Sequence, residues 1–220
     1  MEINSTFDLI AIFARAALIT LEVALFAILL AFLIGLFCSV ILYYEVPVLR
    51  TITKAYVVFF RNTPSLIQAY FIFYGLPKIF IVLDSFTCSV LVLSLLGGSY
   101  MCEAVLSAIK AISKSQKELA LAIGLSRRDT IRFLIFPQAI SISIAAINNN
   151  AIFLTKEVSA MKLILLPEIV YQAFSIISLR ADLILPVVVL MIFSYLVILI
   201  PMSFIFTRLE RKIRYAEFGN

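Results

Sequence analysis

Long, nearly unbroken runs of apolar residues alternate with short polar segments along the chain. A membrane-spanning helix needs about 20 consecutive apolar residues, and five runs match or approach such a span. We therefore predict an all-α integral membrane protein with about five transmembrane helices, which places the two termini on opposite sides of the bilayer. The runs cover residues 9–42, 55–83, 88–109, 133–154 with an extension toward 166, and 183–206.

The second apolar run is interrupted by the sequence Arg61-Asn62-Thr63-Pro64. Proline has no backbone N–H and its ring clashes with the preceding helical turn, so Pro64 is expected to interrupt the span. Carbonyl groups freed near Thr63 then need other partners, which is tolerated where the backbone is buried or faces a cavity. Pore lining and a simple packed kink are both consistent with this pattern.

The composition indicates that lipid, and not only water, surrounds the folded protein. Hydrophobic residues make up 63% of the 220 residues and charged residues only 14%, against about half and a quarter in soluble domains. No repeat or low-complexity run divides the chain, so residues 1–220 are expected to form a single membrane domain. The chain has no histidine and no CxxC pair, so we expect no metal site, and Cys38, Cys88 and Cys102 are interpreted as small buried apolar residues.

The distribution of lysine and arginine predicts the orientation. Cytoplasmic loops carry an excess of these residues, and one set of alternate loops holds most of them, whereas the opposite loops hold Lys78, Lys162 and Arg180. The N-terminus is therefore expected outside, and the 110–132 loop and the C-terminal tail in the cytoplasm. The cations that indicate this side are Arg50, Lys54, Lys110, Lys114, Lys117, Arg127, Arg128, Arg132, Arg208, Arg211, Lys212 and Arg214.

The cytoplasmic segment 114–132, KSQKELALAIGLSRRDTIR, contains signals for two short helices around a glycine corner. Ser115 followed by Glu118 fits a capping box at the start of the first helix. Gly124 suits the left-handed position that ends such a helix. Ser126 and Asp129 repeat the capping pattern, so a second helix is expected to begin there and to continue into the fourth span.

This pair of helices could be a DNA-binding module, a solvated loop or a docking element. DNA binding is disfavoured, because the second helix is already apolar at Phe133 and enters the membrane. Leu119 and Ile123 share a helix face with the small residues Ala120 and Ala122 beside them. That face favours docking in the groove of a cytoplasmic partner.

The same residues resemble a known family. Glu118-Leu119-Ala120, Gly124-Leu125-Ser126 and Phe136-Pro137-Gln138-Ala139 are similar to the EAA loop of ABC-importer membrane subunits, and more narrowly to permeases for polar amino acids such as histidine, glutamine, arginine and opines. The coupling loop would then cover about residues 110–137. Leu119, Phe136 and Asn62 depart from the family's usual residues, as do 106–108 and 157–158, so the substrate preference is not carried over.

Three further motifs extend the resemblance over roughly residues 12–170. They are Arg61-Asn62-Thr63-Pro64 with Gln68 and Tyr74-Gly75-Leu76-Pro77, then Gly98 to Glu103, and more weakly Asn149 with Lys156-Glu157-Val158-Ser159.

The resemblance implies the type I ABC importer permease fold, and a multi-pass subunit in the bacterial cytoplasmic (inner) membrane. The expected partners are a cytoplasmic ATPase dimer, a second permease subunit of the same or a related chain, and an extracytoplasmic binding protein that delivers a polar amino acid. This chain contains no phosphate-binding loop, so ATP and Mg would be used by the ATPase, and no cofactor is expected here. An ATP-independent channel or secondary transporter is the alternative. The residues expected to contact the ATPase are Glu118, Leu119, Ala120, Ile123, Gly124 and Pro137.

Ionisable residues within the apolar runs suggest a substrate path. A charge at mid-bilayer costs about 2.5–3.5 kcal/mol on insertion scales, so each such group should face a partner, an interface or a water-filled path. Structural pairing and substrate binding both remain open, and Glu22 is interpreted as structural. The hypothesis is that Glu103 and Lys156-Glu157 would meet the ammonium and carboxylate groups of an amino acid. The full set assigned to the path is Arg61, Thr63, Pro64, Gln68, Glu103, Asn149, Lys156 and Glu157.

Overall fold

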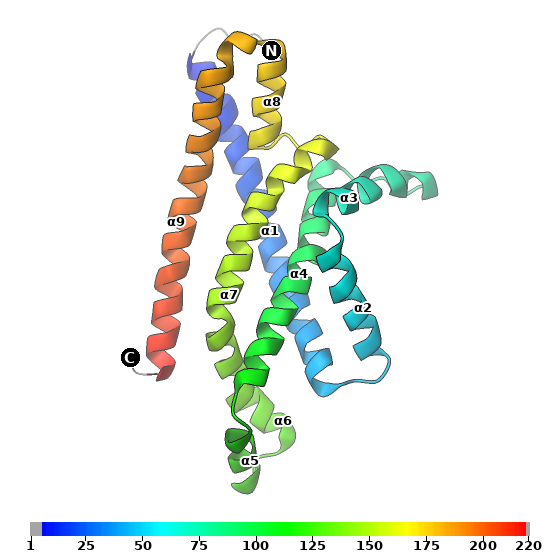
Figure 1. Cartoon of the computed structure of the whole chain (residues 1–220), viewed down its shortest axis with the longest axis vertical. Helices are drawn as coiled ribbons and strands as arrows, with labels where there is room; N and C mark the ends of the chain where they lie inside the picture. Colours follow the sequence, from blue (N-terminus) through cyan, green and yellow to red (C-terminus); the bar gives the residue numbers. More distant parts are fainter. Residues whose placement is uncertain (1–5, 219–220) are drawn as a thin grey trace.

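The computed structural model describes residues 6–218, and every regular element in that range is helical (Figure 1). Within it, four helical stretches are long and apolar enough to cross a membrane: Phe7–Tyr44, Ser85–Ala111, Arg127–Ile164 and Ala181–Ile213. The α-helices are α1 (Thr6–Tyr44), α2 (Leu49–Asn62), α3 (Ser65–Tyr70), α4 (Ser85–Ala111), α5 (Lys114–Ala122), α6 (Arg127–Asp129), α7 (Phe136–Glu157), α8 (Ile169–Leu179) and α9 (Ile184–Phe218).

Shorter 3-10 and π segments join several of these helices. Two of them are π-type, η1 (Phe71–Gly75) and η3 (Thr130–Ile135). Three are 3-10 helices: η2 (Leu76–Ile79), η4 (Val158–Ile164) and η5 (Ala181–Leu183). The predicted first, third, fourth and fifth spans correspond to α1, α4, α7 and α9.

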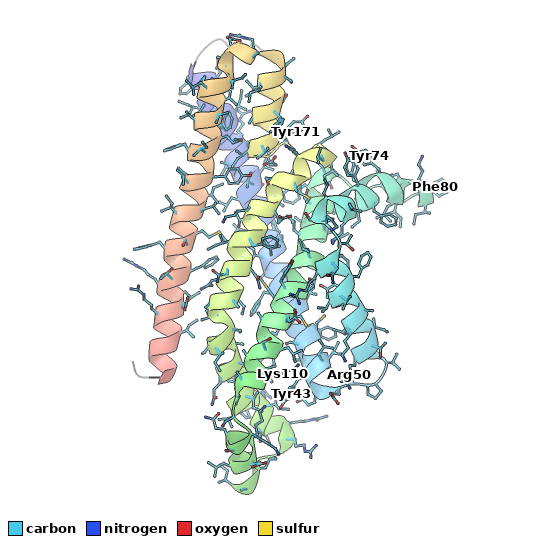
Figure 2. All side chains as sticks on the ribbon, viewed as in Figure 1. Tyr43, Arg50, Tyr74, Phe80, Lys110 and Tyr171 are labelled. Atoms are coloured by element: carbon cyan, nitrogen blue, oxygen red, sulfur yellow. The ribbon has the colours of Figure 1, made fainter. Side chains whose placement is uncertain are left out.

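The second apolar run does not form one membrane-length helix, unlike the single span predicted from its length. It is divided into α2, α3, η1 and η2. Figure 1 shows α2 running beside α4, whereas α3 turns away and η1 and η2 project sideways from the bundle. Phe80, labelled at the tip of this arm in Figure 2, is 96% exposed. Pro64 produces this change of direction, because the residue before a proline is forced out of the helical conformation.

The core is built on close contact between α1 and α4, with α7 packed beside them. Gly97 allows this approach, since a Cβ atom at that position would lie 2.5 Å from a side-chain carbon of Leu154 and 2.8 Å from Cβ of Ala31. Small residues at helix interfaces let helices approach closely in membranes, where packing replaces the hydrophobic effect as the driving force. The three cysteines are buried, as expected for small apolar residues.

A second cluster joins the first half of α1 to α8 and α9. Phe13, Ala16, Ile169, Ala173 and Val187 are buried together there. The sequence analysis did not predict α8, because its 11 residues are too few for a span. Glu168 begins this helix, where its carboxylate accepts hydrogen bonds from the backbone N–H groups of Val170 and Tyr171.

The ends of the bundle agree with the arrangement predicted from the cations. Figure 1 shows the start of α1 beside α8 at one end, and α5 and α6 at the other, toward which the C-terminal half of α9 runs. Figure 2 shows Tyr43, Arg50 and Lys110 toward that end of the bundle. The side of the membrane that each end faces stays a prediction, and the side chain of Arg214 lies outside the described part of the chain.

Candidate functional site

The break after α2 is stabilised by one buried side chain. Thr63 is extended (φ −108°, ψ 128°) and Pro64 precedes the first turn of α3. The Nε2 group of Gln68 donates to the carbonyls of Thr63 at 2.8 Å and Phe60 at 3.1 Å. Its Oε1 atom is buried and has no hydrogen-bond partner in the described part of the chain. The predicted interruption is therefore confirmed, and Gln68 supplies hydrogen-bond donors to the carbonyls of Phe60 and Thr63 at the break.

Charge of both signs meets next to this break. Arg61, in the last turn of α2, forms an ion pair with Glu103 of α4. The guanidinium also lies over the ring of Tyr100, with its Cζ atom 5.1 Å from the ring centroid. The Arg61 and Glu103 side chains are 37% and 48% exposed, so the pair remains accessible. A cation over an aromatic face is stabilised further by the ring quadrupole.

The ion pair borders a hollow of about 480 Å³ between the end of α2, one face of α4 and one face of α7. Tyr100, Glu103 and Ser107 recur at helical spacing on α4, and Ile142, Ala146 and Asn150 do so on α7. Side chains of mixed polarity therefore face each other across the hollow. Its lining is Arg61, Tyr100, Glu103, Ala104, Ser107, Ala108, Ala111, Ile142, Ser143, Ala146 and Asn150.

The remaining residues predicted for the path have different surroundings. Pro64 and Gln68 do not line the hollow, because they form the break beside it. Asn149 does not line it either: Asn150 does, since one residue along a helix rotates the side chain by about 100°. Glu157 accepts a hydrogen bond of 2.5 Å from the hydroxyl of Ser65, which links the end of α7 to the start of α3.

Lys156 faces away from Glu157 and from the hollow. It lines a separate groove between α7 and α9, with Ser203, Thr207 and Arg208 among its neighbours. The structure therefore does not bring Lys156 and Glu103 together, as the sequence hypothesis required. The adjacent positions of Lys156 and Glu157 explain this, because consecutive residues of a helix point in different directions.

The segment 114–132 begins differently from the capping box predicted at Ser115. Ser113 is the N-cap of α5, and its hydroxyl accepts from the backbone N–H of Gln116 at 3.3 Å. The helix starts at Lys114, so Ser115 lies inside its first turn. Glu118 pairs with Lys114 at 3.6 Å on the exposed surface instead of reaching back to the N-cap. The predicted capping box was wrong, because Ile112 leaves α4 in an extended conformation and the following serine is placed first.

The glycine corner is confirmed in detail. Gly124 has φ of +91°, in the left-handed region. Its N–H donates to the carbonyl of Leu121 and the N–H of Leu125 donates to that of Ala120, both at 3.1 Å. These two bonds define a Schellman motif, which satisfies carbonyls at the end of α5.

The second predicted helix start is confirmed as well. Ser126 caps α6, since its hydroxyl accepts from the N–H of Asp129 at 3.1 Å and donates to its carboxylate at 2.6 Å. The helix continues through the π turns of η3 into α7, where Pro137 occupies the first turn. Proline lacks an N–H and crowds the preceding turn, so Pro137 explains why the turns before it widen to the π type.

The outer face of α5 is apolar and exposed. Leu119 is 66% exposed and Ile123 is 73% exposed, whereas Ala120 is buried against the rest of the segment. Lys117 holds α5 against the bundle, because its ammonium group donates to the carbonyl of Ile109 at 3.3 Å and lies 5.6 Å from the ring centroid of Tyr43. The predicted apolar face is therefore presented on a fixed helix.

Sequence reasoning missed several residues at the hollow and the break, among them Tyr100, Asn150 and Ser65. Tyr100 and Asn150 could have been found from helical spacing, because Tyr100 precedes Glu103 by three residues and Asn150 follows Ala146 by four. No comparable signal exists for Ser65, whose partner Glu157 is 92 residues away.

Comparisons with known proteins show which proteins this chain is similar to. A family model described as "Binding-protein-dependent transport system inner membrane component" matches residues 27–215. The chain is 34% identical over 165 residues to the probable glutamine ABC transporter permease protein GlnP of Bacillus subtilis (strain 168), covering 75% of this chain and 76% of the relative. It is 35% identical over 158 residues to the glutamine transport system permease protein GlnP of Escherichia coli (strain K12), covering 70% and 71%.

Solved structures share the fold. The crystal structure of an amino acid ABC transporter with histidines superposes with a TM-score of 0.86 at 24% identity, covering 96% of this chain and 99% of that one. An inward-facing structure of the MetNI methionine ABC transporter gives a TM-score of 0.80 at 18% identity, covering 95% and 99%. The predicted all-helical permease fold of type I importers is thus confirmed.

Proposed function

Since this chain belongs to the family of inner membrane components of binding-protein-dependent transport systems, we propose that it forms the path for a polar amino acid through the hollow beside Arg61 and Glu103. It is the membrane-spanning subunit of an ATP-driven importer, a transporter permease and not an enzyme. The relatives named above include glutamine permeases, which supports an amino acid as the solute.

The observation that carries this proposal is the accessible ion pair. An amino acid presents an ammonium and a carboxylate, and Glu103 and Arg61 offer the complementary charges within one hollow. Its volume of about 480 Å³ is within the roughly 300–1,000 Å³ usual for small-molecule sites. A solute that exchanges its charges with this pair would open the Arg61–Glu103 contact. Asn150 and Ser107 add polar side chains to the lining of the same hollow.

We assign α5 as the contact with a separate cytoplasmic ATPase dimer, which would bind ATP and Mg. Leu119 and Ile123 form an exposed apolar pair that suits a groove on such a partner. Movement of α5 would reach α7 through α6 and η3, because these elements continue into one another. The path would then open alternately to either side, with a second permease subunit completing it. An extracytoplasmic binding protein would deliver the solute at the end of the bundle that carries α8.

In this scheme the chain is a multi-pass protein of the bacterial cytoplasmic membrane, with the N-terminus outside and the C-terminus in the cytoplasm. The family description supports an inner membrane component. The cations near α5 and at the end of α9 support the orientation.

The decisive experiment is uptake of radiolabelled amino acids by the assembled importer carrying Glu103→Gln or Arg61→Gln. We expect each change to raise the solute concentration at half-maximal uptake by at least about tenfold, because hydrogen bonds to charged groups contribute about 1.5–3 kcal/mol. Glu22→Gln is the matched control, since Glu22 is an exposed carboxylate on α1 that does not line the hollow. Unchanged uptake in both site variants would refute the proposed path.

A further experiment distinguishes an ATP-driven importer from an ATP-independent channel or secondary transporter. When the partner ATPase is inactivated by substitution of its phosphate-binding lysine, uptake should cease. Uptake that continues at the same rate would favour an ATP-independent channel or secondary transporter.

A further inference from the structure

A second hollow, unrelated to the ion pair of Arg61 and Glu103, lies between α7 and α9. This groove has a volume of about 620 Å³. Its polar lining includes Lys156 of α7 and Ser203, Thr207, Arg208 and Arg211 of α9. None of the described residues that line it is acidic. The groove therefore combines three cations and two hydroxyl groups without a carboxylate of its own.

The helix geometry directs two of the cations toward each other. The helices α7 and α9 run antiparallel, since the amide of Asn148 donates to the carbonyl of Phe206 at 3.2 Å and the hydroxyl of Thr155 lies 3.4 Å from the sulfur of Met202. Long side chains on a helix lean toward its N-terminus. On antiparallel neighbours, Lys156 and Arg208 therefore lean toward a common level of the groove.

The position of the Arg208 guanidinium supports this direction. Its Cζ atom lies 4.3 Å from the ring centroid of Phe204, one turn toward the start of α9. No ion pair of Lys156 occurs within the described part of the chain. A cation in an apolar span without a partner is unfavourable, so an anion from outside the chain would stabilise this arrangement.

We propose that this groove binds an anionic phospholipid, with its phosphate between Lys156 and Arg208 and an acyl chain along the apolar wall. Ser203 supplies a hydroxyl group on the same face of α9, whereas the hydroxyl of Thr207, one turn further on, donates to the carbonyl of Ser203 at 2.8 Å. The wall next to them is open, because Ile200 is 61% exposed and Phe204 is 57% exposed. Where the assembled importer leaves this wall uncovered, those side chains face lipid, which makes a lipid the nearest source of the anion.

This site differs from a general attraction of basic residues to the membrane surface. Arg208 and Arg211 lie in the last third of α9, toward the end of the bundle that carries α5 (Figure 1). Lys156 lies in the last turn of α7, at the end of that helix far from α5. It lines the same groove as Arg208 and Arg211 because α7 and α9 pack antiparallel. A headgroup held between two helices would restrain their separation, which a surface contact on α9 alone would not do.

The test is native mass spectrometry of the purified full-length importer in detergent supplemented with either phosphatidylglycerol or phosphatidylcholine. We expect at least one phosphatidylglycerol to be retained on the intact protein, and no phosphatidylcholine under the same activation. Lys156→Gln and Arg208→Gln should each reduce the retained phosphatidylglycerol about fivefold, since a basic residue near anionic lipid contributes about 1 kcal/mol. The double variant should lose it almost completely.

Two controls keep the result specific. Lys54→Gln removes an exposed cation of α2 outside the groove and should leave retention unchanged, and Lys156→Arg should preserve it. Undiminished binding in the double variant would overturn the proposal. So would full competition by inorganic phosphate, which would indicate a free-anion site, or a change in oligomeric state of the double variant, which would indicate that a second copy of the chain occupies the groove.

Discussion

Two of the places where the helices are interrupted, the Gly124 corner and the Pro64 break, satisfy their backbone groups in different ways. At the corner, two backbone hydrogen bonds close a Schellman motif on an exposed surface. At the break, one buried glutamine donates to two carbonyls. The corner therefore depends on a backbone conformation that glycine permits, whereas the break depends on a single side chain shielded from water.

This difference determines what a substitution would cost. A corner in water can lose a hydrogen bond and replace it with a solvent contact, so the main penalty there is conformational. A carbonyl that loses its donor inside a protein has no such replacement and carries the full desolvation cost. A substitution at the break should thus lower the stability of the fold. A substitution at the corner should instead reduce the coupling between ATP hydrolysis and uptake.

The largest effect on stability is expected from Gln68→Met. The substitution keeps an unbranched side chain of similar length but leaves the carbonyls of Phe60 and Thr63 without this donor, at a cost of about 2 kcal/mol. Removal of the unpartnered Oε1 atom offsets part of the loss. The free energy of unfolding, measured in mixed detergent micelles, should fall accordingly.

The matched control for that prediction is Ile67→Met, which introduces the same side chain at the exposed neighbouring position. It should change the unfolding free energy by less than about 0.5 kcal/mol. Equal effects of the two substitutions would mean that the glutamine does not hold the break together.

Gly124→Val addresses the corner. A Cβ atom at Gly124 would meet nothing within 4 Å, so the substitution causes no steric overlap. The cost comes from the φ of +91°, which a β-branched residue adopts only at about 1–2 kcal/mol or more. The end of α5 should therefore rearrange, and ATP hydrolysis by the assembled importer should continue with reduced uptake per ATP.

Substitution of Gly124 by asparagine distinguishes the effect of backbone strain from the effect of adding any side chain. Asparagine tolerates the left-handed region, so Gly124→Asn should retain most of the coupling that Gly124→Val loses. Membrane insertion should be normal in both variants, as measured by their yield in the membrane fraction. Normal coupling in the valine variant would show that the corner's conformation is not required.

The same contrast explains which features could be predicted from the sequence. The Gly124 corner and the Ser126 cap were predicted correctly, because their partners lie within five residues. The exposed face of Leu119 and Ile123 was also predictable from helical spacing. These features depend on local chemistry that one short stretch of sequence contains.

Other features depend on contacts distant in sequence or on helix rotation. Rarity of charge within apolar runs identified Arg61 and Glu103, but only the packed helices show that the two form a pair. Which of Asn149 and Asn150 lines the hollow depends on how α7 is rotated about its axis relative to α4, which the sequence does not show. For the same reason the sequence could not show that Lys156 and Glu103, which were assigned to one path, line different hollows. The helix α8 was missed because its burial depends on α1, about 150 residues earlier.

A smaller effect should distinguish the two serines at the start of α5. Ser113→Ala removes the hydroxyl that accepts from the N–H of Gln116 and should destabilise the helix by about 1 kcal/mol. Ser115→Ala should have almost no effect, because Ser115 lies within the first turn and is exposed. Hydrogen exchange of the α5 amides in the purified importer would measure the difference. Faster exchange in the Ser115 variant alone would instead support the capping box at Ser115.

The smallest effect concerns the surface ion pair of the same helix. Lys114 and Glu118 are separated by 3.6 Å, with side chains 89% and 65% exposed. Exposed pairs at this spacing contribute about 0.3–0.5 kcal/mol and are screened by salt. Lys114→Gln should therefore accelerate hydrogen exchange of the α5 amides by no more than about twofold. The difference between the variant and the unchanged protein should vanish at high ionic strength. An effect as large as that of Ser113→Ala, and insensitive to salt, would mean that charge and not capping stabilises α5. In that case α5, unlike a helix held by its cap and its Gly124 corner, would depend on a side-chain ion pair.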